Sequence, residues 1–349
     1  MATAPHHLNA RSARRVAVLL ALLLVDTAPA SPPASSVVAG EPRTALPLER
    51  SDRPAAPPQV LTIEYAAHNG RVREATVLLP AAYSPDTNVP IPLIISPHGR
   101  GANGASNAKF FGSLPTSGNF AVVSPDGMGR GTKGFSYGYE GQIDDLARMP
   151  QIVADALPWV RIDEKRIYAL GSSMGGQETL LLVARHGRML AGAAAMDSVT
   201  DLDRRYDQLL ELRSTPSYAK RWGAPVGVCL QSSMRREVGS TPDTAPHLYA
   251  ARSPLAQAQA IAASGVPLQI WWSSQDAIVI DQEHQSEALY DELRRLGTGA
   301  PLIAYSGRWA HSKEMRATAL LPLALQDFGL LQDGSKAVPR SVKRVEIEA

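Results

Sequence analysis

The sequence predicts an α/β fold in which a mostly parallel central sheet carries helices on both faces. Three observations lead to this prediction. The chain has 349 residues, 44% of them hydrophobic and 19% charged, a composition typical of globular proteins. Short apolar runs alternate with segments of helical spacing between residues 93 and 328. An antiparallel hairpin is expected before them, because two β-rich segments meet at Asn69-Gly70.

Each strand is expected where a short apolar run is bounded by turn residues. Such runs lie at residues 60–65, 72–79, 93–96, 120–124, 166–170, 191–196, 268–272 and 302–305. Apolar residues recur on one helical face at 143–160, and further helices are expected at 177–185, 282–296 and 314–328. Two stretches, 126–141 and 197–267, are long for connections, and the second is expected to form extra helices over the functional site.

The N-terminus has the layout of an export signal. Arg11, Arg14 and Arg15 precede an apolar run at 16–25 that is too short to span a bilayer. Ala28-Pro29-Ala30 then supplies the small residues of a cleavage site. We therefore expect residues 1–30 to be a signal peptide cleaved after Ala30, and the mature protein to be secreted or periplasmic. An uncleaved membrane anchor is the alternative.

Two further segments are expected to flank the folded domain, which we place at residues 59–332. Residues 31–58 contain seven prolines, which indicates a disordered linker, and residues 333–349 are polar and charged, which indicates a loose tail. The formal net charge of +2 would attract no nucleic acid, and the single cysteine excludes an internal disulfide. Once the signal is removed, we expect no stable membrane anchor.

The strongest catalytic signal is Gly171-Ser172-Ser173-Met174-Gly175, a Gly-x-Ser-x-Gly pattern between a β-rich run and a helical run. A nucleophile at such a sharp turn needs neighbours without side chains, because the residues two before and two after it approach closely. The helix that follows directs its positive end at the site, where negative charge develops. We predict that Ser173 is the nucleophile, and a serine that only caps the helix is the alternative.

A serine nucleophile needs a histidine base and a carboxylate that orients it, in the chain order Ser, Asp or Glu, His. His311 lies in the loop after the last predicted strand, and Asp276 follows the penultimate strand. The competing residues are His284, expected at a surface helix position, Asp281, expected to cap that helix, and Asp197 at the end of the preceding strand. We predict His311 as the base and Asp276 as the acid.

The oxyanion of acyl transfer is usually held by two backbone N–H groups. We predict the N–H groups of Met174, which follows the nucleophile, and of Arg100, in the glycine-rich loop after the third strand. In that loop, His98 is expected to brace the backbone. The stretch 126–141 also offers aromatic rings that could stack on the substrate, although anchoring of the long loop is an equal alternative. These rings belong to Phe135, Tyr137 and Tyr139.

Residues 60–330 resemble the catalytic domain of the prolyl-oligopeptidase-like α/β hydrolases. The resemblance rests on His98-Gly99, Pro125-Asp126-Gly127, the turn around Ser173, Gln275-Asp276, His311 and a connector running from Gly239 to Pro254. It implies an α/β-hydrolase fold and serine hydrolase activity. The peptidases of this family carry a β-propeller before the hydrolase domain, whereas here only residues 31–58 separate the signal from the domain. This departure favours an esterase.

Three functions are therefore considered. The first is hydrolysis of a small or polymeric carboxylic ester through an acyl-enzyme, the second is peptide hydrolysis by the same residues, and the third is a binding protein on an inactive hydrolase scaffold. We expect no metal and no cofactor, because the sequence lacks paired histidine ligands, a phosphate-binding loop and a dinucleotide fingerprint.

Overall fold

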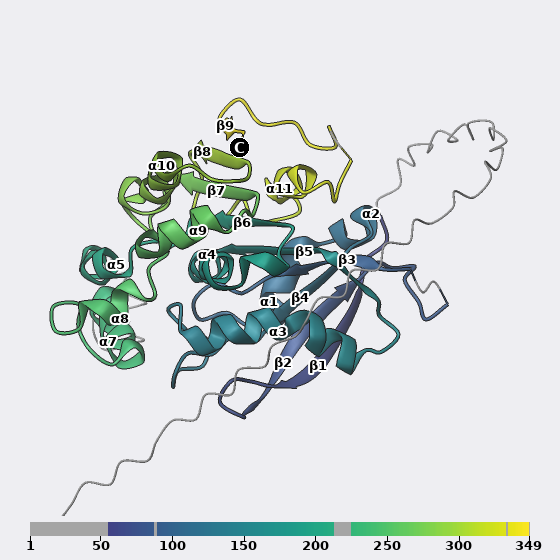
Figure 1. The fold of residues 1–349 in the computed structure, drawn as a ribbon, viewed down its shortest axis with the longest axis horizontal. Helices are drawn as coiled ribbons and strands as arrows, with labels where there is room; N and C mark the ends of the chain where they lie inside the picture. The colour runs from purple at the N-terminus through teal and green to yellow at the C-terminus, as the bar shows by residue number, and fades with distance from the viewer. Residues whose placement is uncertain (1–54, 87–88, 213–224, 333, 349) are drawn as a thin grey trace, which may run out of the picture. The chain divides into compact units, whose positions relative to one another are not determined.

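The computed structural model describes residues 55–86, 89–212, 225–332 and 334–348. The predicted signal peptide and residues 31–54 of the predicted linker lie outside this part. The described chain forms a nine-stranded sheet of order β1-β2-β4-β3-β5-β6-β7-β8-β9 (Figure 1). All neighbouring pairs from β4 to β8 are parallel, and the antiparallel pairs lie at the two ends of the sheet. This arrangement confirms the predicted fold class.

Eight of the nine strands of the described sheet, β1 to β8, fall where the apolar runs predict them. The strands are β1 (Gln59–Ala66), β2 (Val72–Leu79), β3 (Ile91–Ile95), β4 (Ala121–Pro125), β5 (Ile162–Ser172), β6 (Gly192–Met196), β7 (Leu268–Ser273), β8 (Leu302–Gly307) and β9 (Lys343–Ile347). Strands β1 and β2 form the predicted hairpin, in which Ala66 pairs with Val72 next to the turn at Asn69-Gly70. The central strands are buried on both faces, as a parallel sheet covered by helices requires.

Helices cover the two faces of the sheet (Figure 1). One face packs against α3 (Glu140–Ala156), α4 (Met174–His186), α9 (Ala258–Ala263) and α10 (Ser286–Leu296), and the other against α1 (Gly104–Ala108), α2 (Leu114–Gly118) and α11 (Leu321–Asp327). Alternate strand residues enter the two cores, since Leu93 and Ile95 belong to the first and Ile94 to the second. The last predicted helix, at 314–328, is shortened to α11 because residues 311–320 form turns.

A separate group of helices lies beyond the carboxyl ends of β6 and β7, as the long stretch at 197–267 predicts. It comprises α5 (Leu202–Gln208), α7 (Val226–Val238) and α8 (Pro246–Ala250), which we call the cap. The cap has its own apolar core, in which Leu202, Met234 and Tyr249 pack with Tyr137 from the 126–141 loop. Short 3₁₀ turns complete the described chain: Lys109–Phe111, Gly187–Met189, Leu209–Glu211, Leu255–Gln257 and Gln282–His284.

The C-terminal segment corrects the sequence analysis. Residues 343–347, predicted as part of a loose tail, form β9, which pairs antiparallel with β8. Arg344 donates a hydrogen bond to the hydroxyl of Tyr305 (2.9 Å) and pairs with Asp327 (3.3 Å). The polar sequence concealed this strand, because a strand at a sheet edge keeps its charged side chains in water.

None of the helices in the described residues is long and apolar enough to cross a membrane.

Candidate active site

Ser173 occupies the turn between β5 and α4, with φ 59° and ψ −125°, a region that residues with side chains rarely adopt. Its N–H donates to the carbonyl of Met196 on β6 (2.9 Å). A Cβ at Gly171 would lie 2.4 Å from the carbonyl oxygen of Gly175, and a Cβ at Gly175 would lie 2.3 Å from that of Pro97. The two glycines are therefore required by close backbone contacts, which hold the serine in the strained conformation expected of a nucleophile.

His311 and Asp276 form a hydrogen-bonded pair. Nδ1 of His311 lies 2.7 Å from Oδ2 of Asp276. Asp276 is held in turn, since its Oδ1 accepts from the backbone N–H groups of Ile278 (2.8 Å) and Val279 (3.0 Å). A carboxylate bonded to Nδ1 assigns the proton to that atom and leaves Nε2 as a proton acceptor. The pair thus has the arrangement that a general base and its orienting acid need.

The competing residues form a separate pair. His284 bonds through Nδ1 to Asp281 (2.8 Å), and Asp281 also pairs with Arg204. The side chain of His284 is half exposed on the surface, as predicted. Asp281 precedes the 3₁₀ turn at 282–284, but its carboxylate binds these two side chains and makes no capping bond, contrary to the prediction.

The predicted nucleophile and the His311–Asp276 pair lie at the same edge of the sheet. Ser173 follows β5, Asp276 follows β7 and His311 follows β8, and the parallel strands β5 to β8 end on the same side. Ile278 and Val279, next to the acid, line the same pocket as Ser173. No hydrogen bond joins Ser173 to His311 within the described residues, as is common in unliganded sites, where catalytic hydrogen bonds tighten only with substrate.

Asp197, the third candidate acid, has a different position. It lies buried after β6 with φ 46°, and its oxygens accept from Ser273 N (3.1 Å), Trp309 Nε1 (3.0 Å) and Ser312 N (2.9 Å). Two of these donors flank His311, so Asp197 fixes the loop that carries the base. Oxygens of Asp197 and Asp276 and a ring nitrogen of His311 all lie within 4.8 Å of one another.

Glu314 is a buried acid that the sequence analysis missed. Its carboxyl group lies near Asp197, and neither of its oxygens has a hydrogen-bond partner among the described residues. Burial, and then the charge of Asp197, raise the pKa of Glu314 well above its usual range. Burial and the charge of Asp276 raise the pKa of Asp197 to about 6. Because such close carboxylates cannot all be ionised, Glu314 holds a proton at neutral pH. Its position three residues after His311 was the only sequence signal.

The loop after β3 approaches the nucleophile from the other side. A Cβ at Gly99 would lie 3.8 Å from Cβ of Ser173. His98 donates from Nδ1 to the carbonyl of Gly99 (2.8 Å) and accepts at Nε2 from the N–H of Gly127 (2.9 Å). Burial lowers the pKa of His98, which keeps it neutral in this bracing role, as predicted. Arg100 and Met174, the predicted oxyanion donors, both line the pocket beside Ser173.

The aromatic residues of the 126–141 loop have separate roles. Tyr137 lines the pocket and adopts φ 46°, a strained value for a residue of its size. Phe135 packs behind it, with ring centroids 6.4 Å apart. Tyr139 instead packs edge-on against His68 (5.3 Å) and beneath the guanidinium of Arg252 (5.1 Å). Tyr139 thus anchors the loop, which is the alternative that the sequence left open.

Buried charges of the cap and of α4 hold this loop in place. The Glu237 carboxylate accepts from the backbone N–H groups of Arg130, of Gly131 (3.2 Å) and of Thr132 (3.1 Å). Arg252 donates to the carbonyl of Ser136 (3.1 Å), whose hydroxyl bonds to Glu178. Burial raises the pKa of Glu178 to about 8. The position of Tyr137 in the pocket therefore depends on contacts far from it in sequence.

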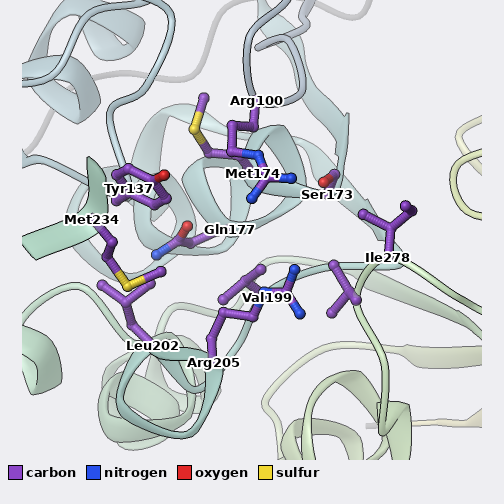
Figure 2. A pocket seen from close by; sticks show the side chains of 11 residues that line it. Arg100, Tyr137, Ser173, Met174, Gln177, Val199, Leu202, Arg205, Met234 and Ile278 are labelled. Atoms are coloured by element: carbon purple, nitrogen blue, oxygen red, sulfur yellow. The ribbon is translucent and has the colours of Figure 1, made fainter. Parts of the chain in front are cut away.

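The pocket beside Ser173 is bounded by the cap, the 126–141 loop and the Asp276 loop (Figure 2). Its apolar lining comes from Val199, Leu202, Met234, Ile278 and Val279. Polar atoms come from Arg100, Tyr137, Gln177 and Arg205. The guanidinium groups of Arg100 and Arg205 extend toward the space between them (Figure 2). The site can thus combine an acyl-transfer centre with a pocket of mixed polarity.

Comparison with known proteins agrees with this geometry. Residues 106–226 match the Prolyl oligopeptidase family. A puromycin hydrolase matches with TM-score 0.54 and 17% identity over 78% of this chain and 39% of its own. The acylaminoacyl peptidase of Pyrococcus horikoshii matches with TM-score 0.58 and 15% identity over 81% and 43%. A puromycin-hydrolyzing peptidase of Mycobacterium tuberculosis matches with TM-score 0.56 and 17% identity over 81% and 40%.

These structural matches establish the α/β-hydrolase fold. The chain spans only 39% to 43% of the length of those solved structures. No curated protein matched the chain. The family match includes the turn at Ser173 but ends before the residues that supply the acid and the base.

Proposed function

Because residues 106–226 match the Prolyl oligopeptidase family and the chain has the α/β-hydrolase fold, we propose that it is a serine hydrolase that cleaves carboxylic esters through Ser173, His311 and Asp276. The observation that carries the proposal is the 2.7 Å bond between His311 and Asp276, at the sheet edge where the strained Ser173 lies. A serine hydroxyl is a weak nucleophile at neutral pH, and a base oriented in this way activates it.

The reaction would proceed in two acyl-transfer steps. Nε2 of His311 takes the proton of the Ser173 hydroxyl as its oxygen attacks the ester carbonyl. The N–H groups of Arg100 and Met174 hold the negative oxygen of the tetrahedral intermediate, and the imidazolium then protonates the leaving alcohol. Water, activated by the same imidazole, releases the acid from the acyl-enzyme. Asp276 stabilises the imidazolium in both steps and keeps Nε2 directed at the reacting atoms.

Peptide hydrolysis by the same residues is the second candidate, and the family match favours it. An amide has a poorer leaving group than an ester, so a peptidase depends more on binding of the flanking substrate groups. The pocket beside Ser173 presents apolar side chains and two arginines to such flanking groups. The ester remains our first choice because it makes the smaller demand on such contacts.

The test is hydrolysis of short 4-nitrophenyl esters by the pure protein and by Ser173→Ala, with aminoacyl and prolyl anilides as peptide analogues. We expect rapid ester cleavage, slow anilide cleavage and loss of both in the variant. Equal rates for the two proteins would reject Ser173. Covalent labelling by a fluorophosphonate separates either enzyme from an inactive binding scaffold, because labelling needs an activated serine.

We also propose that the protein is exported and loses residues 1–30. The basic, apolar and small-residue regions of the N-terminus support this proposal. Expression of the full chain, followed by mass spectrometry of the N-terminus of the protein outside the cytoplasm, tests it. A mature chain beginning at Ser31 is expected, and an intact N-terminus on protein retained in the cell would contradict the proposal.

A further inference from the structure

Arg205 is a buried cation without a partner at the floor of the active-site pocket. It lies on α5, is 2% exposed, and lines the same pocket as Ser173. Its guanidinium makes no hydrogen bond or ion pair with any residue that the structure describes, and its Nη1 is fully buried and unsatisfied. The undescribed residues 213–224 contain no aspartate or glutamate that could neutralise it.

The adjacent Arg204 shows how an arginine of this helix is normally satisfied. It is exposed, and it donates to Asp281 from Nε (2.9 Å) and from Nη2. An unpaired charge taken out of water destabilises the folded protein unless a partner compensates for it. The position of Arg205 therefore lowers the stability of the free protein and suits the binding of an anionic ligand.

Other polar groups in the pocket share this condition. The hydroxyl of Tyr137 and Oε1 of Gln177 are also buried without a hydrogen-bond partner in the described residues, although Gln177 Nε2 donates to the carbonyl of Arg252 (2.7 Å). Burial lowers the pKa of Arg205 to about 9, and the nearby positive charge of Arg100 is the second cause of this shift. A pKa of about 9 leaves the Arg205 guanidinium charged at neutral pH, and much of the surrounding wall is apolar.

We infer that Arg205, with Arg100 and the hydroxyl of Tyr137, binds a carboxylate of the substrate, so that the preferred ester carries an anionic group near the bond that is cleaved. A guanidinium fork and a phenol are donors that match the acceptor oxygens of a carboxylate. The acceptor Oε1 of Gln177 would then take a proton donor, such as a hydroxyl of the substrate or a water. This inference rests on the proposed ester hydrolysis, for which it names the substrate class.

The carboxylate could belong to the acyl half or to the leaving half of the ester, and two substrate pairs distinguish them. The acyl pair is the mono-4-nitrophenyl ester of adipic acid against 4-nitrophenyl hexanoate. The leaving-group pair is 4-acetoxybenzoate against its uncharged methyl ester. We expect the protein to prefer the anion of one pair by roughly tenfold or more in kcat/KM, as a charge-assisted bond in a buried site allows.

The decisive variant is Arg205→Met, which keeps an unbranched, flexible stem and removes the charged guanidinium. The preference for the anionic ester should fall by roughly tenfold or more, and Arg205→Lys should retain part of it. The matched control is Arg204→Met, which removes an equal charge from the same helix and should leave the preference unchanged. Arg205→Met should also raise the melting temperature, because it removes an uncompensated buried charge, whereas a purely structural arginine would lower it.

Binding provides a readout that does not depend on turnover. Calorimetric titration of the Ser173→Ala protein with monomethyl adipate should show binding that Arg205→Met weakens by roughly tenfold or more. The inference would be overturned, while ester hydrolysis stands, by two results together. The kcat/KM values would be equal within each substrate pair, and Arg205→Met would not change the affinity for monomethyl adipate. Absence of ester cleavage and of fluorophosphonate labelling would instead reject the proposed function, and the titration would still decide whether Arg205 binds the anion.

Discussion

The edge of the sheet and the pocket beneath the cap satisfy their polar groups to different degrees. At the edge, the acceptors of Asp276 bind two backbone N–H groups and His311, and Asp197 binds three donors. In the pocket, Arg205, Tyr137 and Gln177 each have a buried polar atom without a partner in the described chain. In the proposed mechanism, the groups for bond cleavage are therefore already hydrogen-bonded before substrate arrives, whereas the groups proposed for recognition still lack partners.

The largest effect should come from Asp276→Asn, which disrupts the organised edge. An amide can hold the imidazole in the wrong tautomer and cannot stabilise its cation, so kcat should fall by roughly 10³ to 10⁴. The rate is measured with a short 4-nitrophenyl ester at neutral pH. Asp281→Asn is the matched control, because Asp281 bonds to His284 and Arg204 and not to His311, and its kcat should stay close to that of the wild type.

Loss of activity in the control variant in place of Asp276→Asn would contradict this assignment. If Asp281→Asn were the inactive variant and Asp276→Asn active, the acid–base pair would be His284 and Asp281. A normal melting temperature for both proteins would show that the rates report on chemistry and not on unfolding.

Glu237→Gln should affect the pocket without touching the catalytic edge. Its carboxylate holds three backbone N–H groups of the loop that positions Tyr137, and an amide oxygen can replace only part of these bonds. We expect the free energy of unfolding to fall by about 1–3 kcal/mol. Because Tyr137 would be less well placed, KM should rise more than kcat falls. Steady-state kinetics and urea denaturation measure the two effects, and a fall in kcat at constant KM would argue against this separation.

The smallest effect should be the pH dependence of stability that Glu314 introduces. Its pKa is raised in the folded protein, so folding is favoured while it holds its proton and is progressively opposed as the pH rises above the unfolded value of 4.5. Glu314→Gln mimics the protonated acid. The variant should match the wild type near pH 4.5 and exceed it by about 1 kcal/mol or more at pH 8.

Denaturation at both pH values tests this prediction, with the exposed Glu164→Gln as control. The control should differ from the wild type equally at both pH values. A Glu314→Gln protein that is less stable than the wild type at pH 8 would show that Glu314 is ionised in the fold and makes a favourable contact there.

Much of the fold could be predicted because its signals are local. The parallel strands are continuous apolar runs, and the turn at Ser173 needs Gly171 and Gly175 whatever surrounds it, since the clashes arise within the turn and with one neighbouring loop. Strand β9 was missed because its stability comes from pairing with β8, and nothing in its own charged sequence indicates that partner.

Arg204 and Arg205 mark the limit of what the sequence by itself determined. The sequence placed a serine, a carboxylate and a histidine after three of the parallel strands, β5, β7 and β8, with glycines where the backbone is crowded. It could not distinguish two adjacent arginines. Neighbouring residues of a helix point in different directions, so the packing of α5 against α7 and α8 decided which one faces Asp281 and water and which one is buried in the pocket. That choice depends on contacts between distant segments, which only the tertiary structure supplies.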